Sequence, residues 1–394
     1  MKEKSTFKKG ECPKINPNDP VVLELWVKAG GRCEFWDCNK YLLKDKLTDI
    51  KAKLADIGHI VARSKNGPRG NDPLPLIKRN DISNLMLLCP NHHRKIDNKK
   101  LVSKYPKNRL IKYKKEHEDR IAFLSGLKDE CKTVVLRFFG IIRGNRTAIS
   151  KEQIRQAILH CAGKYPEYLN GEDPIDINLT AIPESLSKQY WNACKRKIDE
   201  TFKTQVYPQI ENNNIKHISL FALARIPLLI YLGSRMSDKI PMDVYQKMRN
   251  GDEGWLWSKN MKSIRFNRKL LQRGKVSDKV ALILSLSGKI SLGSVPKSIT
   301  ADSTIYEIVP YKTSPNRELI KTKDHLDAFK SCLQMTLRDI ERDHKDAKKI
   351  HLFPAVPISA AIICGKERLT DITPPFSIYD IDNRGQFKYA MEVK

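Results

Sequence analysis

Apolar and polar residues follow two different patterns along this 394-residue chain. Beyond about residue 130, short apolar runs such as TVVLRFF (133–139) alternate with longer segments whose apolar residues are three to four positions apart. Runs of the first kind predict buried strands, and segments of the second kind predict helices. Strands that alternate with helices predict a mostly parallel α/β sheet. Helices are expected at 151–164 and 326–340, and further strands at 279–288, 303–310, 349–355 and 358–365.

The first 128 residues have a different pattern, with many turn residues and only short apolar runs. Strands are expected within GHIVA (58–62) and NLMLL (84–88), and a helix is expected to begin at Pro90, because proline is favoured at the first helical position. A longer helix is expected at 105–128, with a narrow apolar seam between charged residues: Leu110, Tyr113, His117, Ile121 and Leu124. Such a seam suits a connector or a helix–helix interface. We therefore expect His117 to be packed rather than to bind a ligand.

These patterns divide the chain into three parts. Residues 1–104 are expected to form a small α+β domain, residues 105–129 a connecting helix and candidate dimer element, and residues 130–394 a larger α/β domain. The last part is long enough for two sheet units. No internal repeat is evident from its residues, so a duplication is not established.

The charge of the chain favours a polyanionic partner. The chain carries 72 Lys and Arg against 45 Asp and Glu, a formal net charge of +27. The first 120 residues are the most basic part, with 28 basic residues against 15 acidic ones. Such a surface favours nucleic acid, because binding a polyanion releases its counterions. The alternative is that the basic charge serves solubility alone.

Neither a membrane span nor a secretion signal is expected. The longest apolar stretch, 218–233, contains Arg225 and Pro227 and is too short to cross a bilayer. The N-terminus, MKEKSTFKKGE, is charged and has no apolar run. We therefore expect a soluble, cytoplasmic protein, in which the nine cysteines are metal ligands and buried thiols rather than a disulfide framework.

Two short motifs have the spacing of a closed metal site. Cys33 and Cys38 are separated by four residues in GRCEFWDCNK, and Cys89 and His92 are separated by two residues in LCPNHH. Three thiolates and one imidazole are an ordinary tetrahedral set for a structural Zn²⁺ ion, which typically contributes on the order of 10 kcal/mol to folding a small domain. The alternative is that these four are unrelated core residues.

Three further residues stand around these motifs in a recognisable order. His59 in GHIVA, Asn84 in SNLMLLC and His93 next to His92 resemble the His–Asn–His signature of the HNH, or ββα-metal, nucleases, over roughly residues 26–97. The resemblance implies that His59 is the general base that activates water and that Asn84 holds the loop. It also implies that His93 binds a catalytic divalent ion, Mg²⁺ or similar.

Two aspartates are candidates for the remaining ligands of that ion. Asp97 lies four positions after His93, hence on the same helical face, and is expected either to join the ion or to pair with a neighbouring basic side chain. Many members of the family carry an acid or histidine directly before the base, but this chain has Gly58 there. Asp56 is the candidate substitute.

Basic residues surround these motifs and are expected to contact the phosphates of double-stranded DNA without reading its sequence. The candidates are Arg63, Lys65, Arg69, Lys78, Arg79, Arg94 and Lys95.

Three stretches of the C-terminal part, 221–257, 349–366 and 374–393, look like SAVED domains. The resemblance implies an α/β domain of two fused CARF, or Rossmann-like, units that binds a cyclic oligonucleotide, here a cyclic dinucleotide. An HNH domain followed by SAVED resembles the effector endonucleases of CBASS, the cyclic-oligonucleotide-based anti-phage systems. For such an effector the resemblance implies a homo-oligomer, a dimer at rest and a tetramer when activated.

A cyclic dinucleotide needs cations for its phosphates and aromatic faces for its bases, at the carboxyl ends of the strands. The candidate residues are Arg143, Arg146, Trp257, Lys312, Thr313 and Phe353. The alternatives are that Trp257 is a core residue and that Lys312 is a charged residue of a solvated loop.

Two other functions remain open on the sequence. One is a constitutive HNH restriction endonuclease whose C-terminal domain reads DNA. The other is a zinc-stabilised DNA-binding protein without catalysis, against which the joint presence of His59, Asn84 and His93 counts.

Overall fold

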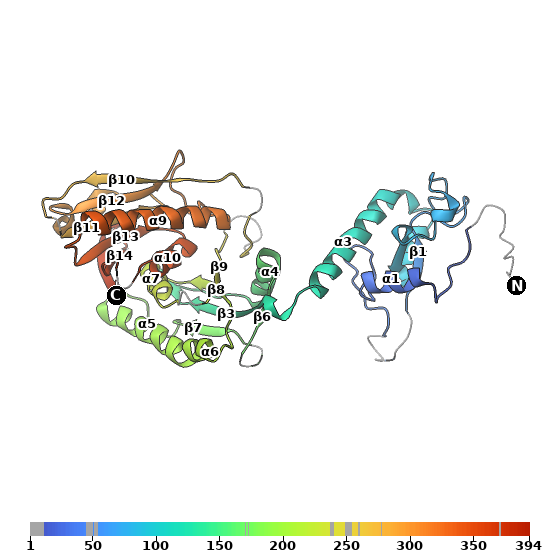
Figure 1. The fold of residues 1–394 in the computed structure, drawn as a ribbon, viewed down its shortest axis with the longest axis horizontal. Coiled ribbons are helices and arrows are strands. Elements are labelled where there is room, and N and C mark those ends of the chain that lie inside the picture. The colour runs from blue at the N-terminus through green and yellow to red at the C-terminus, as the bar shows by residue number, and fades with distance from the viewer. Residues whose placement is uncertain are drawn as a thin grey trace. The chain divides into compact units, whose positions relative to one another are not determined.

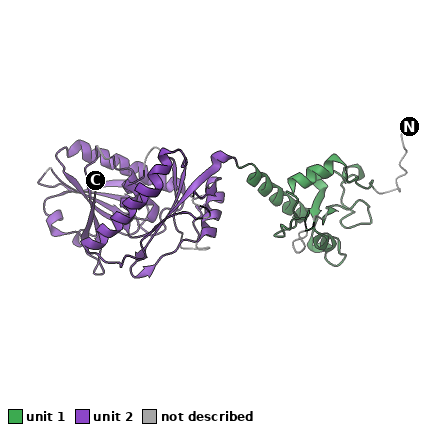
Figure 2. Ribbon diagram, turned by 90° about the horizontal axis from the view of Figure 1, so that it is seen from below, with its two compact units in different colours: residues 1–127 green, residues 128–394 purple. Residues whose placement is uncertain are grey.

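The chain forms two compact units, residues 1–127 and residues 128–394 (Figure 2). In the described part of the chain, no helix is both long enough and apolar enough to span a bilayer. The computed structural model describes residues 12–44, 50, 54–169, 171, 173–236, 240–248, 254–258, 261–276, 278–369 and 372–394.

The first unit is built on two short strands followed by a helix. Its helices and strands are α1 (Pro20–Lys28), β1 (Asp56–His59), β2 (Leu85–Leu88), α2 (Pro90–Asp97) and α3 (Lys107–Ser125), with single 3₁₀ turns at Leu76–Lys78, Ile82–Asn84 and Val102–Lys104. β1 and β2 are antiparallel, with Asp56 opposite Leu88 and His59 opposite Leu85. The predicted order of strand, long loop, strand and helix is therefore present, with α2 beginning at Pro90.

The long helix α3 packs on its own unit. Its buried residues are Leu110, Lys114 and His117, and His117 places Nε2 2.9 Å from the carbonyl oxygen of Ala29, at the end of α1. Ile121 packs against Gly30, where an added Cβ would lie 3.0 Å from the Ile121 side chain. Leu110 and His117 of the predicted seam are thus covered within the unit, whereas Leu124 is exposed; the dimer element stays a prediction.

The second unit begins with an all-parallel sheet. The strand order is β6-β3-β8-β9, with β7 also paired to β3. A small antiparallel hairpin, β4–β5, follows β3. The elements of this half are β3 (Lys132–Phe139), β4 (Ile141–Ile142), β5 (Asn145–Arg146), α4 (Lys151–Ala162), β6 (Tyr165–Glu167), β7 (Ile175–Asn178), α5 (Lys188–Thr201), a π-helical segment (Phe202–Val206), α6 (Tyr207–Glu211), β8 (Ile218–Leu223), α7 (Ile226–Ser234) and β9 (Met242–Val244).

A six-stranded sheet follows, in the order β10-β12-β11-β13-β14-β15 (Figure 1). Its four inner strands are parallel and its two edge strands are antiparallel, which confirms the predicted α/β pattern. The elements of this half are β10 (Phe266–Gln272), β11 (Lys279–Ser285), α8 (Lys297–Thr300), β12 (Thr304–Pro310), α9 (Lys323–Asp343), β13 (Lys349–Ala355), α10 (Ile358–Lys366), β14 (Phe376–Ile381) and β15 (Phe387–Val393).

One predicted strand is wrong. Residues 358–365 form helix α10, in which every residue from Ser359 to Gly365 is buried. A helix that is buried all round is apolar all round, so it has no periodicity to distinguish it from a buried strand.

The structure reveals a repeat that we did not detect in the sequence. β8 followed by α7 corresponds to β13 followed by α10, and the two helices lie side by side (Figure 1). The same residue types recur at equal spacing in the two segments: Ile218, Leu220, Phe221, Ile226, Ile230 and Gly233 in one, Ile350, Leu352, Phe353, Ile358, Ile362 and Gly365 in the other. The second unit therefore contains two related strand–helix segments, one in each sheet.

Paired glycines set the distance between α7 and α10. A Cβ added at Gly233 would overlap the carbonyl oxygen of Ile362, and a Cβ at Gly365 would overlap that of Ile230. The two backbones are in direct contact because neither glycine carries a side chain.

We predict that Gly365→Ala destabilises the second unit by about 1–3 kcal/mol or more, because the new methyl group can only be accommodated by separating α7 from α10. Thermal unfolding of the full chain measures this as a lower Tm. Gly288→Ala is the matched control, because an added Cβ there meets no atom within 4 Å. Equal Tm values for the two variants would show that the close helix contact does not carry stability.

Candidate functional site

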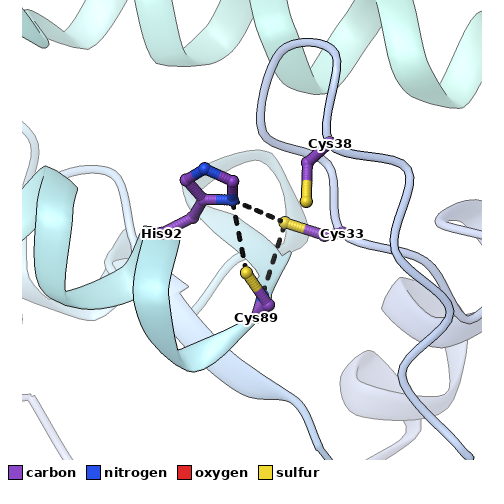
Figure 3. Close-up of side chains that lie close together, drawn as sticks. All are labelled: Cys33, Cys38, Cys89 and His92. Carbon is purple, nitrogen blue, oxygen red and sulfur yellow. Dashed lines mark hydrogen bonds between the residues drawn. The ribbon is translucent and has the colours of Figure 1, made fainter. Parts of the chain in front are cut away.

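Four side chains of the first unit converge on one point (Figure 3). Cys33 and Cys38 come from the loop after α1, Cys89 directly precedes α2, and His92 lies in its first turn. Their ligand atoms all lie within 4.8 Å of one another, and His92 Nδ1 is 3.2 Å from the Sγ of Cys89 and 3.6 Å from that of Cys33. These separations fit the edges of a tetrahedron with metal–sulfur bonds of about 2.3 Å and a metal–nitrogen bond of about 2.0 Å.

The surroundings of the cluster suit a buried zinc ion. The ring of Phe35 stacks on His92 with 4.0 Å between centroids, which fixes the imidazole plane. Burial lowers the pKa of His92, which favours the neutral form that binds metals. Burial also raises the pKa of the Cys33 thiol, and Zn²⁺ would supply the positive charge that a buried thiolate requires. The residues present therefore fit a structural Zn²⁺ site.

A buried ion pair ties α3 to the metal loop. Glu34 is fully buried; it accepts a hydrogen bond of 2.5 Å from the backbone N–H of Leu87 and lies 3.5 Å from the ammonium of Lys114. Burial raises the pKa of Glu34 to about 7, although Lys114 and the Leu87 N–H oppose the shift. The side chain thus joins the loop of Cys33, strand β2 and helix α3 at one place.

Asn84 clamps the long loop that begins after His59. Its buried side chain accepts a hydrogen bond from the Val61 N–H at 2.9 Å and donates to the carbonyls of Val61 and Arg79 at 2.9 and 2.8 Å. Both ends of the amide are therefore used in holding the two ends of the loop against the start of β2. This geometry matches the loop-holding role that the HNH resemblance implies for Asn84.

His59 lies at the end of β1 and is mostly buried. Its Nε2 lies 3.0 Å from the side-chain oxygen of Asn80, which favours the tautomer that carries the proton on Nε2 and leaves Nδ1 free to accept one. Burial lowers the pKa of His59, and the Asn80 hydrogen bond opposes the shift. Arg63 lowers the pKa further. A neutral imidazole at neutral pH is the form that a general base requires.

His93 engages a carboxylate at each of its two nitrogens. Nδ1 lies 3.2 Å from Asp56, and Nε2 lies 3.5 Å from Asp97. Asp97 also pairs with Arg69 at 3.0 Å, so its partner is neither Arg94 nor Lys95. The two carboxylates face opposite edges of the His93 ring and do not converge on one point. Among the described residues, the closely spaced group of possible metal ligands is the Cys/His cluster. Because Asp97 is held by Arg69, Asp56 is the better placed partner for an ion bound to His93.

Gly58, directly before His59, lies where a larger side chain has little room. A Cβ there would lie 2.8 Å from the end of the Leu88 side chain and 3.2 Å from the His93 ring, so one or both of these side chains would have to shift. Asp56 and Gly58 lie on the same face of the strand, because side chains alternate. Asp56, the candidate acid, therefore lies two residues before Gly58 on the same face of β1.

Five of the seven predicted phosphate-binding residues are at least partly exposed. Lys65, Lys78, Arg94 and Lys95 are exposed, and Arg63 is half-buried and donates to the carbonyl of Cys12 at 2.8 Å.

Arg69 and Arg79 require a correction. The Arg69 guanidinium donates to the carbonyls of Ile60 and Ile96, and the side chain of Arg79 is buried and donates to carbonyls of its own loop. They hold the loop and are not available to DNA. Spacing does not reveal that an arginine is turned inward.

A cavity of about 450 Å³ lies in the second unit, where residues follow the carboxyl ends of β3, β8 and β14. Ligands of parallel α/β sheets bind at this edge. Three arginines, from three separate segments, contribute positive charge to it. The lining residues are Arg143, Gly144, Glu184, Ser185, Leu186, Arg225, Asp382, Asn383 and Arg384.

The structure distributes the predicted nucleotide-binding residues over several places. Arg143 lines this cavity, and Arg146 is exposed on the same hairpin. Lys312 and Thr313 are exposed and do not line the cavity. Trp257 is largely buried and lines a different cavity of about 630 Å³.

Phe353 requires a correction. It is fully buried in β13 and stacks on Tyr379 with 4.5 Å between ring centroids, so it is a core residue.

Residues that the sequence did not single out complete the cavity. Arg225 lies two residues after the end of β8 at Leu223, and Arg384 follows β14, so a search for cations after strand ends would have found both. Glu184 lies in a loop without any local signal.

Residues 198–393 match the family model of SAVED, the SMODS-associated and fused to various effectors sensor domain. This part of the chain is a SAVED sensor domain. A comparison with curated proteins gave no match.

Among solved structures, the chain is similar to the Cap4 SAVED/CARF-domain containing receptor of Acinetobacter baumannii with the cyclic trinucleotide 3′3′3′-cAAA. The identity is 14% and the TM-score 0.42, over 75% of this chain and 61% of that one. It is also similar to the Cap4 SAVED/CARF-domain containing receptor of Moraxella osloensis, with 14% identity and a TM-score of 0.38 over 77% and 60% of the two chains. This chain thus spans about 60% of the length of the solved structures that it matches.

We predict that substitutions of the two adjacent histidines of α2 have different effects. His92→Ala removes one of four zinc ligands, so the purified chain should contain much less zinc and its first unit should become sensitive to protease. His93→Ala leaves the four ligands intact and should retain both zinc and protease resistance. Metal analysis by plasma emission, with limited proteolysis, makes the comparison. Full zinc content in His92→Ala would contradict the assignment.

Proposed function

We propose that this protein is a DNA endonuclease that is activated by a cyclic oligonucleotide, the function implied by its resemblance to the HNH–SAVED effectors of CBASS. One observation carries the proposal. A ββα unit that combines His59, the Asn84 clamp and His93 beside a zinc-type cluster lies on the same chain as a SAVED sensor domain. A nuclease centre and a sensor in one chain are the parts that an effector requires.

The chemistry follows from the residues of the centre. Neutral His59 takes a proton from a water molecule, whose oxygen attacks the phosphorus of a phosphodiester while the bond to the 3′ oxygen breaks. His93 and Asp56 would hold a divalent cation such as Mg²⁺, which would supply positive charge for the phosphate and for the leaving oxygen. Asn84 keeps the loop after His59 in place, so that the base and His93 remain on the same side of the unit.

Exposed basic residues favour a nucleic-acid substrate. Lys65, Lys78, Arg94 and Lys95 are exposed in the unit that holds His59, and the chain carries a net charge of +27. Contacts of this kind neutralise phosphates without reading bases. We infer that the substrate is double-stranded DNA cut with weak sequence preference.

The cavity of the sensor has a size and charges that suit a nucleotide activator. About 450 Å³ is within the usual range of small-molecule sites, and Arg143, Arg225 and Arg384 provide cations for phosphates. A cyclic dinucleotide is the proposed ligand. Its binding would convert a resting dimer into an active tetramer, and moving such an equilibrium from 1:99 to 99:1 takes about 5.5 kcal/mol of differential binding.

The proposal predicts that purified protein with Mg²⁺ cuts plasmid DNA only when a cyclic nucleotide is present. The assay uses a panel of cyclic di- and trinucleotides and a control without nucleotide. Cutting in that control would indicate a constitutive restriction enzyme. DNA binding without cutting under every condition would indicate a non-catalytic DNA-binding protein.

We predict that His59→Ala lowers the cleavage rate by about 10²- to 10⁴-fold, the usual contribution of a positioned base, and leaves zinc content unchanged. Glu116→Ala, on the exposed face of α3, is the control and should cut normally. The pKa of His59 is lowered from its usual value of 6.5, so the neutral base already predominates at pH 6.5. The wild-type rate should therefore fall steeply only as the pH drops below that value. A rate that still rises steeply with pH above 7 would assign the proton transfer to another group.

A further inference from the structure

The carboxylate of Glu184 is bound in the sensor cavity as an anion ligand would be. Oε1 accepts a hydrogen bond from the backbone N–H of Arg143 at 2.9 Å, and Oε2 accepts one from that of Gly144 at 2.7 Å. The guanidinium of Arg225 donates to Oε1 at 2.6 Å. Two adjacent N–H groups and a guanidinium on one pair of oxygens form a typical phosphate-binding set.

The two N–H groups come from a tight turn with positive φ angles. Arg143 and Gly144 form the two-residue turn of the β4–β5 hairpin, with φ angles of +51° and +80°. Both central residues of such a turn need positive φ, and asparagine–glycine is the favoured pair because a larger side chain is disfavoured there. The turn directs successive N–H groups toward one side, and concavities of this kind bind anions. Arginine at the less favourable position also provides a cation at the rim of the cavity.

We propose that Glu184 occupies the place of a ligand phosphate in the free protein and that a phosphate of the activating nucleotide displaces it. The inference rests on the proposed function, since it concerns the ligand site of the same sensor. Glu184 is then an internal competitor that must leave Arg143, Gly144 and Arg225 before the ligand is fully bound.

The charges of the cavity allow this exchange. Burial raises the pKa of Glu184, but the hydrogen bonds from Gly144, Arg225 and Arg143 outweigh it and the pKa is lowered overall. The group that leaves is therefore an anion, and a phosphate replaces it without a change in the sign of the charge. Arg225 remains oriented during the exchange, because Asp380 also holds it, at 2.6 Å.

Two further cations are ready for the rest of the ligand. The side chains of Arg143 and Arg384 are exposed, and within the described ranges neither has a carboxylate within 4.0 Å. A cyclic oligonucleotide carries more than one phosphate, so one can replace Glu184 while another meets these guanidinium groups.

Glu184 can leave without disturbing the core. It belongs to the loop between β7 and α5, and its neighbours Pro183 and Ser185 are exposed. The next helix is held independently, because Ser187 caps α5 by accepting a hydrogen bond from the Tyr190 N–H. Rotation of the Glu184 side chain alone therefore breaks its own contacts, while Ile182 and Leu186 stay packed on the core and α5 stays capped.

The test is Glu184→Gln, which keeps the size of the side chain and one acceptor oxygen but removes the competing charge. Isothermal titration calorimetry with cyclic di-GMP, cyclic GMP–AMP and cyclic tri-AMP should give about tenfold or greater tightening, because a site freed from a competing state gains affinity. Glu200→Gln, on the exposed face of α5, should leave the affinity unchanged. Unchanged or weaker binding in folded Glu184→Gln would overturn the inference, and Glu184→Ala provides a second variant if the first does not fold.

A second titrant separates this inference from the proposed function. If no cyclic nucleotide binds to either protein, the sensor function fails, and pyrophosphate then decides the inference alone. Tighter binding of pyrophosphate to Glu184→Gln than to the wild type would support the internal competitor. Equal binding, or none to either protein, would overturn it.

Discussion

The first turn of α2 is the constraint on which the first unit depends. Cys89 and His92 lie on the side of the helix that meets Cys33 and Cys38, and His93 follows about 100° further round. Adjacent histidines therefore face two different sites. A metal that fixes His92 also fixes the rotation of α2, and with it the position of His93 beside Asp56. The structural cluster and the proposed catalytic centre are in this way coupled through a single helical turn.

Close packing without side chains serves both units. Gly58 lets α2 approach β1, and the pair Gly233 and Gly365 lets α7 approach α10. Gly233 and Gly365 bring two backbones together that a side chain would separate, whereas Gly58 leaves room for the side chains of Leu88 and His93. The sites depend on this, because α2 carries His93 and Arg225 directly precedes α7.

The repeat within the second unit is unequal where the ligand is proposed to bind. Arg225 precedes Ile226 of α7, whereas Pro357 precedes Ile358 of α10 at the corresponding position. One half therefore contributes the central guanidinium, and the other half contributes Asp380, which holds it. The two related halves of the fold therefore contribute different charges to the cavity.

The sequence predicted best where the signal is local. The spacing of Cys33, Cys38, Cys89 and His92 indicated a cluster that the structure brings within 4.8 Å, and alternating apolar runs indicated a parallel α/β domain. Prediction failed where the outcome depends on distant packing. Arg69 and Arg79 resemble surface cations in the sequence but are turned inward, and Phe353, near the carboxyl end of a predicted strand, resembles a ligand-binding aromatic but is buried in the core. Glu184 could not be found because its partners are about 40 residues away in either direction along the chain.

The central claim is that occupancy of the sensor controls the nuclease of the same chain. The most direct measurement titrates one cyclic nucleotide into a single sample and records its binding and the rate of DNA cleavage together. The account predicts that both rise over the same range of concentration and that both are lost in Arg225→Ala, which retains its zinc. Full cleavage at zero occupancy, or saturated binding without any cleavage, would contradict it.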